Sequence, residues 1–206
     1  MSLRKSFCRL SLALCFVVCG ALLPANVYAK TARTTRAAQS RQTVTGTVVS
    51  ISGRQAGRTR QFTLRVNGYT SASEAERLNN ALRSGGEDEL MNVLSRLDAG
   101  RISIGTGVGV PANAVIATPS AEGGTKLMVL FERDVGFSEL RAGARRADYR
   151  FGYMEIFLDR RGRGEGTFIP AAKIKLQGDT WVVEDFGAFP ARLMGVRSSG
   201  SVNTAR

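Results

Sequence analysis

The chain has 206 residues and a formal net charge of +12, from 29 Lys and Arg residues against 17 Asp and Glu residues. It contains no histidine, which excludes Ser-His-Asp and Cys-His catalysis as well as zinc sites with histidine ligands. The length is typical of one globular domain with a sizeable apolar core.

The N-terminal segment has the features of an export signal. A basic start with Arg4, Lys5 and Arg9 precedes an apolar stretch at 10–23, and small residues precede the expected cleavage site after Ala29. A membrane-spanning helix needs about 20 apolar residues, and this stretch is shorter. We therefore expect a periplasmic or extracellular protein that meets the membrane only through its signal; an uncleaved anchor is the alternative.

Cleavage would remove residues 1–29 as a signal peptide, and with them all the cysteines of the chain, Cys8, Cys15 and Cys19. The mature chain would then have neither disulfides nor thiol chemistry. Residues 30–42 contain no acid and are rich in Thr, Ala, Ser and Gln, which predicts a disordered basic head. We expect a single domain over residues 43–196 and a flexible tail over residues 197–206.

The first half of this domain predicts a β-hairpin followed by two helices. Residues 43–51 are rich in β-branched side chains, and residues 60–66 alternate between apolar and polar side chains, as strands do. Ser71 and Glu74 then form a capping-box signal. Apolar residues at helical spacing follow, interrupted by the Gly-Gly pair at 85–86. We expect two short amphipathic helices that form a hairpin on the sheet.

A glycine-rich segment follows the short strand predicted at residues 101–104. Gly105, Gly107 and Gly109 lie in it, but a phosphate-binding loop requires a helix directly afterwards. Pro111 follows instead, so we expect a flexible loop rather than a nucleotide site. Residues 126–132 predict a central, strongly apolar strand.

Four strands are predicted in the C-terminal part, at residues 151–159, 167–176, 181–186 and 191–196. Glycines in the intervening turns, Gly162 and Gly178, suit hairpin loops. A first loop centred on Gly162 places Tyr153 opposite Ala171. A turn at Gly178 places Ile174 opposite Val183. Pro170 does not fit a central strand, because proline cannot donate to the ladder; we expect a bulge there or a strand that starts at Ala171.

These registers predict one apolar face and one more polar face, because side chains alternate across a sheet. The predicted core face carries Met154, Ile156, Leu158, Phe168, Ile174, Leu176, Trp181 and Val183. The other face carries Phe151, Tyr153, Glu155, Lys173, Glu184 and Phe186. We therefore predict a mainly β protein of the α+β class. Its antiparallel sheet, which includes the C-terminal four-strand meander, can curve like a barrel and is covered by the two-helix hairpin.

Two carboxylates on the polar face are the candidate catalytic residues. Glu155 and Glu184 would lie on one surface near aromatic side chains, and glycoside hydrolases use two such carboxylates. The simpler interpretation, which we favour, is that Glu184 pairs with Lys173 across the strands. The acidic residues near turns lack the spacing of a calcium loop, so we expect no metal and no cofactor.

Arginines on either side of the strand at 151–159 are the candidate ligand-binding residues. They are Arg141, Arg145, Arg146, Arg150, Arg160 and Arg161, together with Arg163. Guanidinium groups suit phosphate and carboxylate ligands, so these residues could form one anion-binding patch. The alternative is a pair of solvated arginine-rich loops.

Several segments resemble a family of uncharacterised secreted proteins of acidobacterial-type soil bacteria. They are GEGTFIPAAKI at 164–174, VEDFG at 183–187, PARL at 190–193, and RISIG at 101–105. The resemblance covers most of the domain, from Phe62 to Val196. It implies an extracytoplasmic, single-domain protein, but the family has no assigned activity, cofactor or catalytic residue.

We therefore predict an exported, non-enzymatic envelope or secreted module with an arginine-rich surface that contacts anions. Its expected partners are an anionic envelope polymer or lipid head groups, with no specific binding of nucleic acid. The alternative is a carboxylate-dependent hydrolase that acts on a cell-wall or extracellular glycan.

Overall fold

The structure is a computed structural model and describes residues 41–51, 56–121, 123–133, 148–178, 180–185 and 190–200, which belong to one compact unit, Arg36–Arg206. The predicted signal peptide, almost all of the basic head and the end of the tail lie outside the described residues. No helix in the described ranges is long and apolar enough to cross a membrane.

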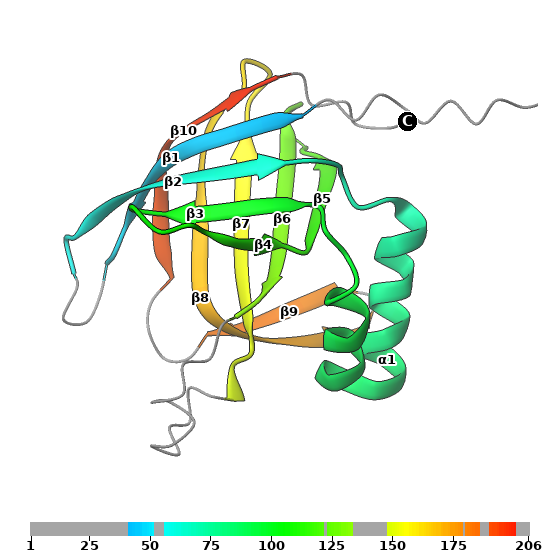
Figure 1. The fold of residues 1–206 in the computed structure, drawn as a ribbon. Coiled ribbons are helices and arrows are strands. Elements are labelled where there is room, and N and C mark those ends of the chain that lie inside the picture. Colours follow the sequence, from blue (N-terminus) through cyan, green and yellow to red (C-terminus); the bar gives the residue numbers. More distant parts are fainter. Residues whose placement is uncertain are drawn as a thin grey trace, which may run out of the picture. The chain divides into compact units, whose positions relative to one another are not determined.

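An antiparallel sheet dominates the described structure (Figure 1). Its strands are β1 (Gln42–Val49), β2 (Thr59–Val66), β3 (Gly100–Ile104), β4 (Val110–Ala112), β5 (Ala114–Pro119), β6 (Thr125–Glu132), β7 (Phe151–Leu158), β8 (Arg163–Gln177), β9 (Thr180–Asp185) and β10 (Ala191–Ser199). They follow the order β4-β3-β2-β1-β10-β8-β7-β6-β5, and β9 pairs with β8 outside this path. The predicted curved, barrel-like antiparallel sheet is confirmed.

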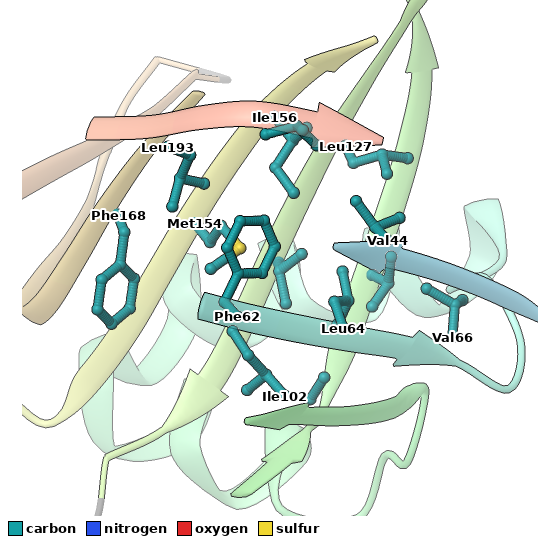
Figure 2. Packing of buried hydrophobic residues seen from close by; sticks show 14 of the residues in the cluster. Val44, Phe62, Leu64, Val66, Ile102, Leu127, Met154, Ile156, Phe168 and Leu193 are labelled. Atoms are coloured by element: carbon teal, nitrogen blue, oxygen red, sulfur yellow. The ribbon is translucent and has the colours of Figure 1, made fainter. Parts of the chain in front are cut away.

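The inside of this nearly closed sheet is filled by apolar side chains. Strands β1 to β4 run across strands β5 to β8 (Figure 1), and alternate residues of both groups point into the space between them. Figure 2 shows Phe62 and Leu64 of β2 facing Met154 and Ile156 of β7. All four are almost completely buried. Because the core face consists of every second residue, the residues between them form the outer face of the barrel.

The two ends of the sheet meet at Asn113, the single residue between β4 and β5. Its side chain is only 6% exposed. The Nδ2 atom donates to the Leu97 carbonyl at 3.2 Å, and Oδ1 accepts from the Glu132 backbone N–H at 3.0 Å. The amide thus satisfies two backbone groups where the regular ladder is interrupted.

One helix, α1 (Ala72–Leu94), packs against the lower part of the sheet (Figure 1). The predicted capping box is confirmed: Ser71 Oγ accepts from the Glu74 N–H at 3.3 Å, and Glu74 Oε2 accepts from the Ser71 N–H at 2.8 Å. The predicted two-helix hairpin is wrong. No loop interrupts the element, and only Gly86 leaves the helical conformation, with φ 64° and ψ −150°. Glycine adopts this positive φ without steric cost, so the helix kinks instead of ending.

A bulge at Pro170 divides β8 into two segments. A bulge was one of the two predicted explanations for a proline at this position; the other, a strand that starts at Ala171, is not observed. The register of β7 against β8 shifts between the Tyr153↔Ile169 and Phe151↔Ala172 pairs. Before the bulge, Phe168 faces the barrel interior; after it, Ala172 and Ile174 face the helix. The extra residue reverses the alternation, as expected for a bulge.

The predicted single core face is therefore wrong. Ile156 and Leu158 lie in the barrel core, whereas Ile174 lies in a second cluster with the buried helix residues Leu78 and Leu90, and Trp181 packs against that cluster. Phe151 and Tyr153, predicted on the more polar face, belong to this second cluster and are buried. The prediction assumed that side chains alternate between the two faces without interruption along β8, and the bulge at Pro170 reverses this alternation.

Only one of the two predicted registers is confirmed. Ile174 is opposite Val183, as predicted. Tyr153, however, is opposite Ile169 rather than Ala171, because β8 begins at Arg163 and leaves a shorter loop than expected.

The predicted four-strand meander is also only partly right. The last strand, β10, does not pair with β9; it pairs with β1 and with the first segment of β8. β9 pairs with the second segment of β8, from Ala172 onward. A long strand that bends at the bulge can hold a different neighbour on each side of the bend.

Two strands were not predicted. β4 and β5 lie in and after the segment that was expected to be a flexible loop. The first strand also begins earlier and the last ends later than predicted: β1 includes the buried Gln42, and β10 continues to Ser199.

Neighbouring residues of β7 test the assignment of the inner and outer faces. Ile156→Ala should lower the free energy of unfolding by about 2–5 kcal/mol, because it leaves a cavity in the packed core. Phe157→Ala should cost less than about 1 kcal/mol, since this side chain is 43% exposed. Urea unfolding of both variants measures the difference. Equal costs would contradict the alternation on β7.

The closure at Asn113 gives a second prediction. Asn113→Ala should lower the free energy of unfolding by about 1–3 kcal/mol, because the Leu97 carbonyl and the Glu132 N–H lose their buried partner. Asn92→Ala is the control: among the described residues this exposed amide donates only to Glu89, and its loss should change stability by no more than about 0.5 kcal/mol. Indistinguishable unfolding curves for the two variants would contradict the role of Asn113.

Candidate anion-binding surface

The turn between β7 and β8 holds three arginines in a fixed loop. The Asp159 carboxylate accepts hydrogen bonds from the backbone N–H groups of Arg161 and Arg163, both at 2.8 Å. An aspartate that starts a tight turn commonly binds the backbone in this way. The bond from the Arg163 N–H, which has the largest effect, and the bond from the Arg161 N–H both lower the pKa of Asp159. The carboxylate is thus engaged by the backbone of the turn.

An open hollow of about 720 Å³ lies beside this turn. Arg160, Arg161 and Arg163 line it from one side, and the β5–β6 turn lines it from the other. Arg160 Nε donates to the carbonyl of Gly123 at 3.1 Å. A Cβ atom at Gly123 would lie only 2.7 Å from Arg160 Nη2, so the absence of a side chain there lets the guanidinium lie against the turn.

Among the described residues, no ion pair balances the charge of the arginines around the hollow. Glu165 is the second acidic residue in its lining, but in the described part of the chain neither it nor Asp159 forms an ion pair with the three arginines. Phe157 adds an exposed aromatic ring, and Lys126 Nζ lies 5.5 Å from the centre of that ring. The hollow therefore offers guanidinium groups beside an apolar surface, which suits an anionic ligand.

The predicted arginine residues are only partly brought together. Arg160 and Arg161 lie in one turn with Arg163, whereas Arg141, Arg145 and Arg146 lie outside the described residues. Arg150 precedes β7, so the length of that strand, about 26 Å for eight residues, separates it from the turn.

Arg150 has its own surroundings at that end of β7. It forms an ion pair with Asp88 of the helix and lines a different hollow together with Arg133. The structure thus places Arg150 apart from Arg160 and Arg161.

The two candidate catalytic carboxylates are also held apart. Glu155 is opposite Thr167 of β8, and Glu184 is opposite Lys173. These positions are six residues apart on β8 and lie on opposite sides of the bulge at Pro170. Glu155 forms an ion pair with Lys126.

Glu184 lies opposite Lys173 as predicted, but its bonding partner is a different lysine. Its carboxylate accepts from Lys175 Nζ at 2.5 Å and from the Tyr149 hydroxyl at 3.2 Å. The bond from Lys175 lowers the pKa of Glu184 and raises the pKa of Lys175. Lys173 Nζ instead lies 4.9 Å from the centre of the Tyr149 ring.

Glu87 has a role that the sequence analysis missed. Its carboxylate accepts from the backbone N–H of Ile174 at 2.9 Å. Ala172 is still opposite Phe151 of β7, but from Lys173 onward no described strand pairs with β8 on the edge away from β9. Glu87 satisfies a donor on that edge. Glu87 directly follows the kink at Gly86, and no pattern of neighbouring residues indicates which strand it meets.

Among the described residues, no group of three potential metal-binding side chains comes close enough to hold an ion. No family model matches the chain, and no curated protein or solved structure is significantly similar to it.

Glu87 predicts a pH dependence of stability. Burial raises its pKa above the ordinary value of 4.5, although the Ile174 N–H and nearby cations oppose this shift. The folded state therefore binds this proton more tightly than the unfolded chain, and stability falls as pH rises through the raised pKa. Relative to Glu87→Gln, the wild type should gain stability as pH is lowered from neutral toward about 4.5.

Thermal unfolding of the wild type and Glu87→Gln across this pH range measures the effect. The other carboxylates are common to both proteins, so the difference between their midpoints isolates Glu87. A difference that does not change with pH, or that grows in the opposite direction, would contradict the raised pKa.

Proposed function

We propose that the protein is an exported, non-enzymatic binding module of the envelope or the secreted fraction. Its arginine-rich surface contacts an anionic envelope polymer or lipid head groups. One observation carries the proposal: three arginines from a single hairpin line an open hollow without forming ion pairs to any described carboxylate.

The hairpin carries more positive than negative charge among its described residues. Asp159 fixes the backbone of Arg161 and Arg163 in the turn, and its carboxylate attracts both of these arginines. One carboxylate does not neutralise three arginines, so an excess of positive charge remains in the hairpin. An external anion would neutralise this excess charge and could accept paired N–H groups from each guanidinium. Binding an anion would therefore use the positive charge that Asp159 leaves unmatched.

The hydrolase alternative has less support. Glycoside hydrolases need two carboxyl groups within about 5–9.5 Å, whereas the register offsets Glu155 from Glu184 by six residues of β8. Each of the two is also engaged by a lysine. Export, by contrast, is supported by the basic and apolar segments before Ala29.

The proposal predicts that the triple variant Arg160→Ala, Arg161→Ala, Arg163→Ala binds anionic surfaces poorly. An arginine near an anionic membrane contributes about 1 kcal/mol, so affinity for phosphatidylglycerol-containing vesicles should fall roughly 100-fold. Retention on a dextran sulfate column should fall as well, and both interactions of the wild type should weaken with salt.

A matched control removes the same charge from the helix side. Arg77, Arg83 and Arg96 are exposed on or just after α1, and replacing all three with Ala should leave most of the binding intact. If the two triple variants lose equal affinity, binding reflects only net charge and the hairpin site is wrong. A wild type that binds neither anionic vesicles nor dextran sulfate would also contradict the proposal.

A further inference from the structure

Five neighbouring strands of the sheet contain no acidic residue. These strands, β4, β3, β2, β1 and β10, lie side by side (Figure 1). They carry five arginines, Arg60, Arg65, Arg101, Arg192 and Arg197. Charges of both signs normally intersperse on the surface of a soluble protein, so half of this barrel is unusually basic.

Four exposed arginines form two opposed pairs on the outer face of the barrel. Arg65 of β2 is directly opposite Arg101 of β3, and Arg197 of β10 is directly opposite Arg163 of β8. Their neighbours along the strands, such as Leu64 and Val196, are buried in the core. The alternation therefore fixes all four arginines on the outside.

Hydroxyl side chains lie in the same rows as these pairs. Thr43 of β1 is opposite Arg65, and Thr45 is opposite Arg197. Thr63 and Ser103 continue the second row across β2 and β3. Hydroxyl groups can donate to phosphate or sulfate oxygens, as arginines do.

Like charges directly opposite each other destabilise a sheet. In the described chain no carboxylate pairs with any of these four arginines; Arg101 donates only to the Gly109 carbonyl, at 3.1 Å. We propose that this outer face, defined by Arg65, Arg101, Arg163 and Arg197, binds a linear polyanion with repeated phosphate or sulfate groups. The inference deepens the proposed function, on which it rests, by naming the class of partner.

The spacing of the pairs favours an extended polymer over a small anion. From Arg101 on β3 to Arg163 on β8 there are four strand-to-strand steps, which amount to about 19 Å. A small anion can reach one pair, whereas a chain of at least this length can reach both. Simultaneous contact at linked sites strengthens binding by mass action.

The shape and composition of the face favour a flexible chain over a membrane. The outside of a nearly closed sheet is convex, so a flat bilayer would touch only part of it. Of the large apolar side chains on β1 to β4 and β10, only Met194 is well exposed, at 51%. Proteins that lie in the bilayer interface insert several apolar side chains, and this face does not provide them.

Titrations of the full chain with tripolyphosphate and with long-chain polyphosphate test the inference. The wild type should bind the long chain at least about 100-fold more tightly than tripolyphosphate. The variant Arg65→Ala, Arg101→Ala, Arg197→Ala should lose at least about tenfold of the long-chain affinity. The helix variant Arg77→Ala, Arg83→Ala, Arg96→Ala should lose much less, and equal unfolding midpoints would show that all variants remain folded.

The possible outcomes separate this inference from the proposed function. If the face variant binds the long chain as the wild type does while the hairpin variant has lost binding, the polymer face is wrong and the hairpin site stands. If neither variant differs from the helix variant, both proposals fail. Equal wild-type affinity for the short and long chains, or tighter binding to phosphatidylglycerol-containing vesicles than to long-chain polyphosphate, would also overturn the polymer inference.

Discussion

The described structure depends on one constraint: the inner face of a nearly closed sheet must be filled by apolar side chains. Phe62, Leu64, Met154 and Ile156 fill it from strands that cross each other (Figure 2). Burial of this kind is the main favourable contribution to folding, and close packing leaves no room for polar groups without partners. Charges are therefore confined to the outer face, the turns and the helix. The surface proposed to bind anions is a consequence of the same alternation that builds the core.

The bulge at Pro170 gives the fold its second apolar cluster. Without the extra residue, Ile174 would continue the face of Phe168 toward the barrel interior. With it, Ile174 turns toward α1 and lies with Leu78 and Leu90. The same bend parts β8 from β7 and leaves the Ile174 N–H to the Glu87 carboxylate. Partial burial of that carboxylate is unfavourable, but an unpaired backbone donor would be unfavourable too.

Local chemistry could be predicted from the sequence, and long-range pairing could not. The capping box at Ser71, the turn at Gly178 and the anomaly at Pro170 each depend on a few adjacent residues, and the structure confirms them. The pairing of β10 with β1, and the closure at Asn113, join segments far apart in the chain. For the candidate site, the sequence indicated the hairpin arginines. The rows that contain Arg65 and Arg197 could be recognised only once the order of the strands in the sheet was known.

The distribution of charge gives the barrel a polarity that a polyanion could use. Helix α1 has five acidic residues against two arginines, whereas strands β1 to β4 and β10 have five arginines and no acid. Salt screens the electric field of exposed charges beyond about 8 Å at physiological ionic strength. The negative charge of the helix therefore does not cancel the attraction between the basic strands and a polyanion in contact with them. It would still repel a polyanion that approached from the helix side, and thereby favour encounters with the strands. Net charge alone cannot produce this preference, because it depends on where the sheet places each arginine.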